Sequence, residues 1–275
     1  FEEEDKGPFP HLMLKEMHDQ PISLSNVLGG RISSDGLNAK LGGFALTPQE
    51  IRGLDRINLV ACGTAYYAAE IGANLLRRHS EITVEPFRAS EFPASDVCGQ
   101  RTLTIGISQS GETKDTLDAL QRAKINGGHV SSFCNVIGST IARFTSNGAY
   151  LYAGQEFAVA STKAFTCQLI VLASLAIHIG RINGNLSDDD ENNYVKSLLD
   201  VPRLISNVLD QEEDLIKIVK ELNPIKNALY LGRGQMYPVA LEGALKLKEI
   251  SYIHAEGYPA GEMKHGPIAL LEKGL

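Results

Sequence analysis

The fold is decided by residues 103–113, which read LTIGISQSGET. Leu103 to Ile107 is a short apolar run with β-branched residues, a pattern typical of a buried strand. A polar turn follows, and a helical pattern then runs from Glu112 to Ile125. A buried strand that leads through a polar turn into a helix is the repeating unit of a parallel sheet.

The same alternation continues on both sides of this stretch. We expect further strands at residues 57–62, 82–86 and 130–134, and helices at residues 64–78 and 162–179. Strands that alternate with helices of this length indicate an α/β fold, in which helices cover both faces of a parallel sheet.

The strand–glycine–helix unit occurs a second time near the C-terminus. A shift of 171 residues (234 − 63) matches Gly63 with Gly234, Tyr66 with Tyr237, Ala69 with Ala240, Gly72 with Gly243 and Ala73 with Ala244. Each set follows a predicted strand and opens a predicted helix. The matches therefore predict a tandem duplication of one α/β subdomain.

The repeat divides the chain into four parts. We expect an N-terminal linker with helices at 1–54, a first subdomain at 55–185, connecting helices at 186–225 and the start of a second subdomain at 226–275. By the same offset, the second copy should continue about 80 residues beyond Leu275. We therefore expect the second copy to be truncated, and we expect both ends of this stretch to be points at which it was cut from a longer polypeptide.

Composition excludes several classes of protein. The net charge of −7 and the pI near 5.5 argue against a nucleic-acid partner. The four cysteines form no CxxC pair and no signal peptide is visible, which favours reduced thiols in the cytoplasm. The apolar run Leu169–Ile177 is too short to span a membrane. Gly63 is followed by no further GxxG, so we expect no nucleotide cofactor, and we expect no metal.

The turn after the central strand is the strongest candidate for a ligand site. Ser108, Ser110 and Thr113 supply three hydroxyls and Gln109 an amide, at the carboxyl end of a strand and the start of a helix. Such a helix start offers free N–H groups and a partial positive charge to an anion. The alternative is that Ser110 only caps the helix. Three hydroxyls and a glutamine within six residues favour a ligand.

Two further turns carry hydroxyl groups at a predicted helix start. Thr64 follows Gly63, and the run Val159–Ser161 follows Glu156. Either turn alone is most simply a helix cap. Together with the first turn, they indicate a polar pocket at one edge of the sheet.

The acid–base candidates lie in the second copy. Glu242, Lys246 and Glu249 are four and three residues apart, so they share one face of a helix expected at 236–250. By spacing alone, a solvated salt-bridge stripe explains them. Glu249, however, falls in the last helical turn, where the negative end of the helix dipole favours a carboxyl group that takes up protons. His265 follows on a loop and could move protons, although a lone loop histidine usually has no such role.

These residues resemble a known family. The stretches Ser108–Thr113, Val159–Phe165 and Leu231–Pro267 resemble the isomerase half of glucosamine-6-phosphate synthases, which are glutamine:fructose-6-phosphate amidotransferases. The run LKLKEISYIHAE at 245–256 is the most specific part, and the resemblance covers nearly the whole chain. It implies two tandem sugar-isomerase (SIS) subdomains of flavodoxin-like type.

The resemblance also implies the roles of individual residues. Phosphate and sugar would be bound by Ser108, Gln109, Ser110, Thr113, Thr64, Val159 and Ser161. Glu249 would move the proton between C1 and C2, and Lys246 would support it. His265 would reach in from the other subunit of a homodimer and open the sugar ring. Where the family commonly has a serine after Cys-Gly-Thr, this chain has Ala65, which puts one sugar contact in doubt.

The resemblance names the ligands and the missing parts as well. Fructose 6-phosphate, glucose 6-phosphate and glucosamine 6-phosphate would be the sugar ligands, and an N-terminal glutaminase domain would supply ammonia. A lysine near the family's C-terminus, which forms an imine with the substrate, would lie beyond Leu275. We therefore expect this stretch alone to be incomplete for catalysis.

Two other functions remain open. One is a related SIS aminosugar isomerase or deglycase that has no glutaminase half. The other is a non-catalytic SIS sensor of sugar phosphates, which would keep the turn at 108–113 but would not need Glu249 or His265. The presence of both residues argues against the sensor.

Overall fold

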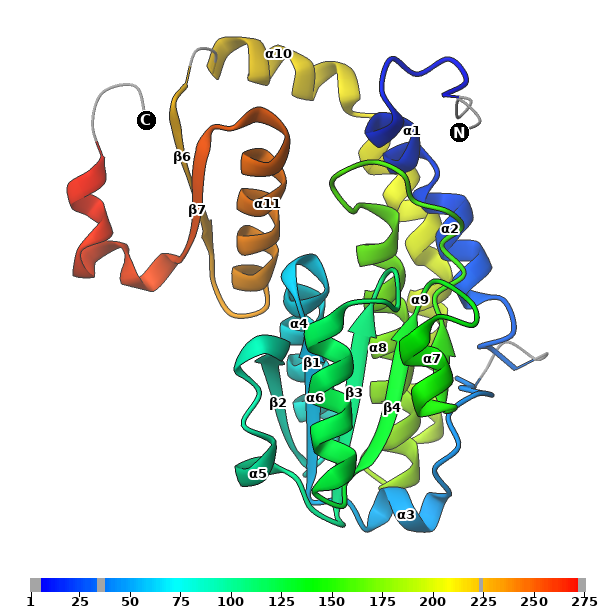
Figure 1. Ribbon diagram of the computed structural model, residues 1–275. Coiled ribbons are helices and arrows are strands. Elements are labelled where there is room, and N and C mark those ends of the chain that lie inside the picture. Colours follow the sequence, from blue (N-terminus) through cyan, green and yellow to red (C-terminus); the bar gives the residue numbers. More distant parts are fainter. Residues whose placement is uncertain (1–5, 34–37, 223–224, 272–275) are drawn as a thin grey trace.

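The computed structural model describes residues 6–33, 38–222 and 225–271 (Figure 1). Five parallel strands form one sheet in the order β2-β1-β3-β4-β5, an order known from flavodoxin-like folds. Their bounds are β1 Arg56–Ala61, β2 Thr83–Arg88, β3 Thr102–Ser108, β4 His129–Cys134 and β5 Gly148–Tyr150. The expected α/β fold with a parallel sheet is confirmed.

Helices cover both faces of this sheet. On one face, α4 (Gly63–His79) and α8 (Lys163–Ile182) enclose a core that includes Ile57, Leu59 and Ile105. On the other face, α6 (Lys114–Ile125) and α7 (Thr140–Thr145) pack around Val60 and Phe92. Figure 1 shows α6 in front of the sheet and α8 behind it. Every residue of β3 is buried, which agrees with its position in the middle of the sheet.

The second N-terminal helix belongs to the same core. Helix α2 (Gln20–Leu28) packs against α8 and α9 (Asp188–Leu209) with Leu24 and Val27 fully buried, and α1 (Leu12–His18) contacts α2. Within the described residues, α8 is the one helix that could cross a membrane by length and composition. Because most of it is buried against α4 and α2, it serves here as a core helix.

The acidic run at 183–193 contains the start of a helix. Helix α9 begins at Asp188, within the region 186–225 where connecting helices were expected. Ser187 and Asp190 form a capping box, and acidic side chains in a first turn are favoured by the helix dipole. Glu191 is buried and pairs with Arg181 at 2.8 Å. The run is therefore a helix start that joins two packed helices.

The second copy contributes a parallel strand pair, β6 (Asn227–Gly232) and β7 (His254–Pro259), joined by α11 (Met236–Ser251). Both strands begin 171 residues after their counterparts β1 and β2 (227 − 56 and 254 − 83). Gly63 and Gly234 occupy the same place in the two units and have φ angles of +54° and +56°. A left-handed conformation of this kind favours glycine. The two units thus share their geometry as well as their sequence pattern.

The remaining elements are short or peripheral. They are α3 Pro48–Arg52, η1 Ala89–Glu91, α5 Ala94–Val97, α10 Glu212–Leu222, η2 Ala260–His265 and η3 Pro267–Leu270. The expected cuts at the two chain ends lie at residues 1–5 and 272–275, outside the described residues.

Candidate functional site

The turn after β3 is held by its own hydroxyl groups. Ser108 is buried, its Oγ accepts a hydrogen bond from the Gly111 amide at 3.0 Å, and it lies 2.9 Å from Thr113 Oγ1. Ser110 Oγ accepts from the Glu112 amide at 3.2 Å, which leaves its own O–H free to donate outwards. Gly111 has a φ of +66°, and a Cβ atom there would overlap the Ser139 hydroxyl. The turn therefore has one well-defined shape that presents hydroxyls to a ligand.

The start of α6 is open to an anion. Thr113 is its N-cap residue, and no described side chain caps the helix. The first turn of a helix has N–H groups without partners inside the helix, and these project outwards from its N-terminal end. The helix begins at Lys114, two residues later than predicted, so Ser110 is not its N-cap. This geometry suits a phosphate at the turn.

The start of α8 is occupied by a protein carboxylate instead. Glu156 Oε1 accepts from the amides of Thr162 at 2.8 Å and Ala164 at 3.2 Å, and its Oε2 accepts from Ser161 Oγ at 2.8 Å. Because the Ser161 hydrogen is used in this way, its oxygen is left as an acceptor. Val159 is 92% exposed, so its backbone is accessible. Of these two helix starts, α6 is the better place for a phosphate.

Helix α11 of the second copy contacts the first subdomain at the carboxyl ends of its strands. Lys246 Nζ donates to Thr64 Oγ1 at 3.0 Å and pairs with Glu249 at 2.7 Å. Thr64 opens α4, directly after β1, and β1 lies beside β3 in the sheet. Residues that are 182 positions apart in sequence are thus joined by hydrogen bonds, and the acid–base candidates lie at the same sheet edge as the Ser108 turn.

Glu242 is the acid–base candidate for which the spacing suggested only a solvated salt bridge, whereas the structure buries it. It is only 6% exposed, its Oε1 accepts from Thr64 at 3.1 Å, and its Oε2 has no partner among the described residues. Burial raises the pKa of this carboxyl, and Lys246 at 3.5 Å partly offsets the rise. The small residue next to Glu242 in the sequence gave no signal of this contact, because Gly243 faces Tyr230 of β6 and not α4.

His265 stands apart from the other site residues. It lies in the short 3-10 helix η2 and is exposed. Among the described residues, no hydrogen bond or ion pair joins it to Lys246 or Glu249. Gln109 lines an open cleft of about 930 Å³ together with residues 154–157, and neither Lys246 nor Glu249 lines that cleft.

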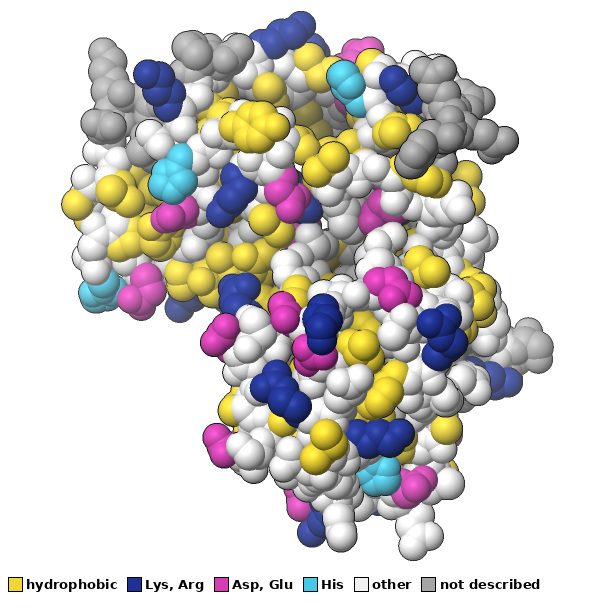
Figure 2. Space-filling model, in the orientation of Figure 1, with side chains coloured by type: hydrophobic (Ala, Val, Ile, Leu, Met, Phe, Trp, Pro, Cys, Tyr) yellow, Lys and Arg dark blue, Asp and Glu magenta, His cyan; other side chains and the backbone are white. Residues whose placement is uncertain are grey.

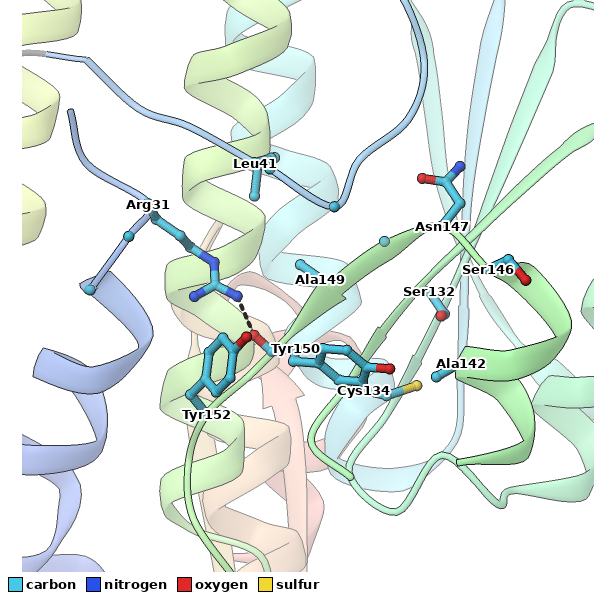
Figure 3. Close-up of a pocket in the computed structure, with 15 residues that line it drawn as sticks. Arg31, Leu41, Ser132, Cys134, Ala142, Ser146, Asn147, Ala149, Tyr150 and Tyr152 are labelled. Carbon is cyan, nitrogen blue, oxygen red and sulfur yellow. Dashed lines mark hydrogen bonds between the residues drawn. The ribbon is translucent and has the colours of Figure 1, made fainter. Parts of the chain in front are cut away.

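A second cavity lies elsewhere on the first sheet. It measures about 510 Å³ and lies at the edge formed by β5, where none of the predicted site residues lines it (Figure 3). The Arg31 guanidinium donates to the carbonyl oxygens of Val27 and Tyr150, and it lies 5.5 Å from the centre of the Tyr152 ring.

The distribution of charged side chains and of metal-ligating side chains bears on which ligands the protein could bind. On the face shown in Figure 2, basic and acidic side chains are interspersed and do not form one continuous basic surface. In the part of the chain that the structure describes, no group of three or more His, Cys, Asp or Glu side chains is arranged to hold a metal ion.

Comparison with known proteins adds sequence relatives. The SIS domain family model matches residues 50–178 and 221–275. A glutamine–fructose-6-phosphate aminotransferase (isomerizing) of Bacteroides thetaiotaomicron is 46% identical over 98% of this chain. One of Thermus thermophilus is 45% identical over 100% of it. The chain spans only 44% and 45% of the length of these two relatives.

Solved structures show the same relationship. The C-terminal domain of glucosamine-fructose-6-phosphate aminotransferase from Francisella tularensis is 36% identical, with a TM-score of 0.92, and the match covers 98% of this chain and 76% of that one. A putative phosphosugar isomerase from Clostridium difficile shares the fold, with a TM-score of 0.83 at 23% identity over 94% of this chain and 72% of that one.

Proposed function

Since this chain belongs to the SIS domain family, and within it to the isomerase half of glutamine–fructose-6-phosphate aminotransferases, we propose that it binds fructose 6-phosphate and catalyses ketose–aldose isomerisation. In the intact protein this step would complete the conversion of fructose 6-phosphate and glutamine-derived ammonia to glucosamine 6-phosphate. The same pocket would accept glucose 6-phosphate. The observation that carries the proposal is the hydrogen bond from Lys246 to Thr64, at the edge of the sheet that carries the hydroxyl-rich turn, together with the pairing of Glu249 with the same Lys246.

The phosphate is assigned to the start of α6. The N–H groups of the first helical turn would receive its oxygens, and the free O–H of Ser110 would donate to it. Ser108 and Thr113 share one hydrogen in their mutual bond, so one of their two hydroxyl hydrogens remains for the ligand. With the phosphate there, Gln109, Thr64, Ser161 and the backbone of Val159 are left for the sugar.

The proton transfer is assigned to Glu249. A ketose becomes an aldose when a base removes a proton from C1 and returns it to C2, and a carboxylate beside an ammonium group can do both. Lys246 holds Glu249 at 2.7 Å and Thr64 at 3.0 Å, so it fixes the carboxylate relative to the sugar pocket. Ala65 offers no hydroxyl beside Thr64, and the Thr64 O–H already donates to Glu242, so we propose that Thr64 offers the sugar an acceptor oxygen there.

The wider assembly is part of the same proposal. An N-terminal glutaminase domain would supply ammonia, the protein would act in the cytoplasm as a homodimer, and His265 of one subunit would open the sugar ring in the site of the other. We propose subdomains at 55–185 and 226–275, in keeping with the repeat. The near-full coverage of this chain by aminotransferases that are more than twice as long supports a further domain in the intact protein.

Hydroxyl removal tests the phosphate assignment. Ser110→Ala and Thr113→Ala should each weaken fructose 6-phosphate binding by about 1.5–3 kcal/mol, because each removes a partner of a charged ligand. Isothermal calorimetry on the intact protein measures this. Ser197→Ala is the matched control, because Ser197 is an exposed hydroxyl on α9 far along the chain from the turn. Affinities equal to that of the parent in both turn variants would refute the assignment.

A further inference from the structure

Glu16, on α1, carries a buried carboxylate that the proposed mechanism does not use. It is 2% exposed, and its Oε1 accepts from the amides of Phe157 at 2.6 Å and Ala158 at 3.1 Å. Burial of a carboxylate is costly unless hydrogen bonds compensate for the lost water. The two amides supply that compensation, and they belong to a loop 141 residues away in sequence. The carboxylate therefore fastens this loop to the N-terminal helix.

The fastened loop is the one that leads to two of the proposed sugar contacts. Val159 follows Ala158 directly and is 92% exposed, so burial does little to fix its position. Ser161 is held from within the loop, because its hydroxyl donates to Glu156. The segment 156–161 is thus held by two carboxylates. Glu156 fixes its end against α8, and Glu16 fixes its middle from outside.

Other contacts from the same N-terminal segment support this attachment. Ser23 Oγ donates to the carbonyl oxygen of Ala153 at 3.0 Å. Lys163, buried at the start of α8, pairs with Asp19 at 3.3 Å. Residues on both sides of segment 156–161 are therefore tied to α1 and α2. Between these ties, Glu16 makes the direct contact with the loop backbone.

The position of Glu16 has a second notable feature. Its Oε2 is buried and has no hydrogen-bond partner among the described residues. An unpartnered buried carboxylate oxygen reduces stability, so a residue selected for stability alone would be better replaced by one without it. A carboxylate is the side chain that accepts two neighbouring N–H groups on one oxygen with charge assistance. The position of Glu16 therefore suits a residue that holds the loop backbone in place, and not one that contributes only to stability.

We propose that Glu16 is a positioning residue for the sugar-facing loop 156–161, through the amides of Phe157 and Ala158. The inference rests on the proposed function, because that function places Val159 and Ser161 at the sugar. Glu16 itself touches neither substrate nor reacting atoms. It sets where the loop backbone lies, and so it acts on binding of the sugar in ground state and transition state alike.

Three variants of the intact protein test the inference. Glu16→Ala should speed hydrogen exchange at the Phe157 and Ala158 amides, and it should raise the KM for fructose 6-phosphate about tenfold with little change in kcat. Glu16→Gln should retain most of the affinity, because its amide oxygen still accepts both N–H groups. Glu16→Asp keeps the charge but is one methylene too short, so it should behave like the alanine variant. Glu16→Asp also serves if alanine prevents folding.

Glu50→Ala is the matched control. Glu50 also accepts a backbone amide, that of Thr47 at 2.7 Å, but it lies in α3 at the opposite end of the sheet (Figure 1). It should lower stability without any change in KM or in exchange at 157–158.

Each result decides a separate point. Unchanged exchange at Phe157 and Ala158 in Glu16→Ala would show that Glu16 does not hold the loop. Faster exchange with unchanged KM and sugar affinity would show that it holds the loop without positioning it for substrate, and either result overturns the inference. If the unaltered intact protein binds no fructose 6-phosphate, the proposed function fails, and the exchange data alone then decide whether Glu16 holds the loop.

Discussion

Glu242 and Lys246 face each other across one helical turn, yet their environments differ. Glu242 is buried against Thr64 with one oxygen unpartnered, whereas Lys246 reaches both Thr64 and Glu249. Lys246 would therefore stay paired if Glu242 lost its charge. This makes Glu242 a suitable residue for a test of electrostatics at the junction between α4 and α11.

The raised pKa of Glu242 predicts a specific pH dependence of stability. The folded state holds the Glu242 proton to a higher pH than the unfolded state, whose carboxyl has the ordinary value of 4.5. The stability associated with this proton is fully present below pH 4.5 and is lost as pH rises through the folded-state pKa. Glu242→Gln stays neutral at every pH. Urea denaturation should therefore show the variant gaining stability relative to the parent as pH rises from 4.5 to 8.

An exposed glutamate supplies the control for this prediction. Glu213 lies in the first turn of α10 and is exposed, so Glu213→Gln should show a smaller difference from the parent, without the gain on raising the pH. A parent and a Glu242→Gln variant whose stabilities run parallel from pH 4.5 to 8 would contradict the raised pKa.

Residue roles were predictable from the sequence where the partners are close in the chain. The turn Ser108–Thr113 makes its hydroxyl contacts within itself, so its composition indicated a polar site. Glu16 and Glu242 were not predictable in this way. Their partners, Phe157 and Thr64, lie more than a hundred residues away, and only the folded chain brings them together. The same holds for Lys246, whose side-chain spacing alone suggested a solvated stripe.

At the scale of elements, periodicity predicted the long helices and the buried strands of the first subdomain. It missed β5 and α7, which have three and six residues, because so few residues show no periodicity. It also missed β7, whose sequence HAEGYP has a glycine in the middle and no apolar alternation. The repeat could have found β7, because β7 begins 171 residues after β2 (254 − 83).

The contact between α4 and α8 depends on a glycine. A Cβ atom at Gly72 would lie 2.8 Å from both Cδ atoms of Leu172 and 3.0 Å from its Cβ. Gly72→Ala should therefore lower the free energy of unfolding by about 1–3 kcal/mol, despite the better helix propensity of alanine. Leu172→Ala should lower it by about 2–5 kcal/mol. The double variant should lose less than the two single losses together, because the new methyl group occupies space that Leu172 has vacated.

Urea denaturation of the four proteins in this cycle measures the coupling. Gly99→Ala is the control, since a Cβ atom at Gly99 would meet no atom within 4 Å. It should change stability by no more than about 0.5 kcal/mol. Additive losses at Gly72 and Leu172 would mean that α4 and α8 do not pack as closely as the structure shows.

The second unit, formed by β6, α11 and β7, contacts the first subdomain at the carboxyl ends of its strands. Helix α11 contacts α4, and the segment at 260–270, drawn in red in Figure 1, lies on the side of the β6–β7 pair away from α4. The repeat predicted that the two units would have the same internal geometry. It could not predict which helices would touch, because docking depends on surface shape and not on an offset in sequence.

This arrangement bears on the proposed role of His265. Within one chain, Lys246 contacts both Thr64 and Glu249, while His265 is exposed in the outlying segment and bonds to neither Lys246 nor Glu249. If His265 takes part in the reaction of a homodimer, it is free to enter the site of the second subunit. Glu249→Gln should abolish proton transfer while binding is kept, and His265→Ala should slow ring opening.

A mixture of these two variants tests whether subunits share a site. After exchange of subunits in equal amounts, half of the dimers contain one chain of each kind. In each of these heterodimers, one site then has both Glu249 and His265, and the other has neither. Half of the dimers with one working site in two gives activity of about a quarter of that of the unaltered protein. If each subunit uses its own histidine, no working site forms and activity stays at the level of the separate variants.

In a second mixture, shared sites should give less activity than separate sites, the reverse of the first mixture. The double variant Glu249→Gln/His265→Ala is combined in equal amounts with the unaltered protein. With shared sites, one site of each heterodimer lacks Glu249 and the other lacks His265, so neither site works. Only the unaltered homodimers are then active, and about a quarter of the activity remains. With separate sites, every unaltered chain still works and about half remains. Activity near a half in this mixture, together with no recovery in the first, would rule out the shared site.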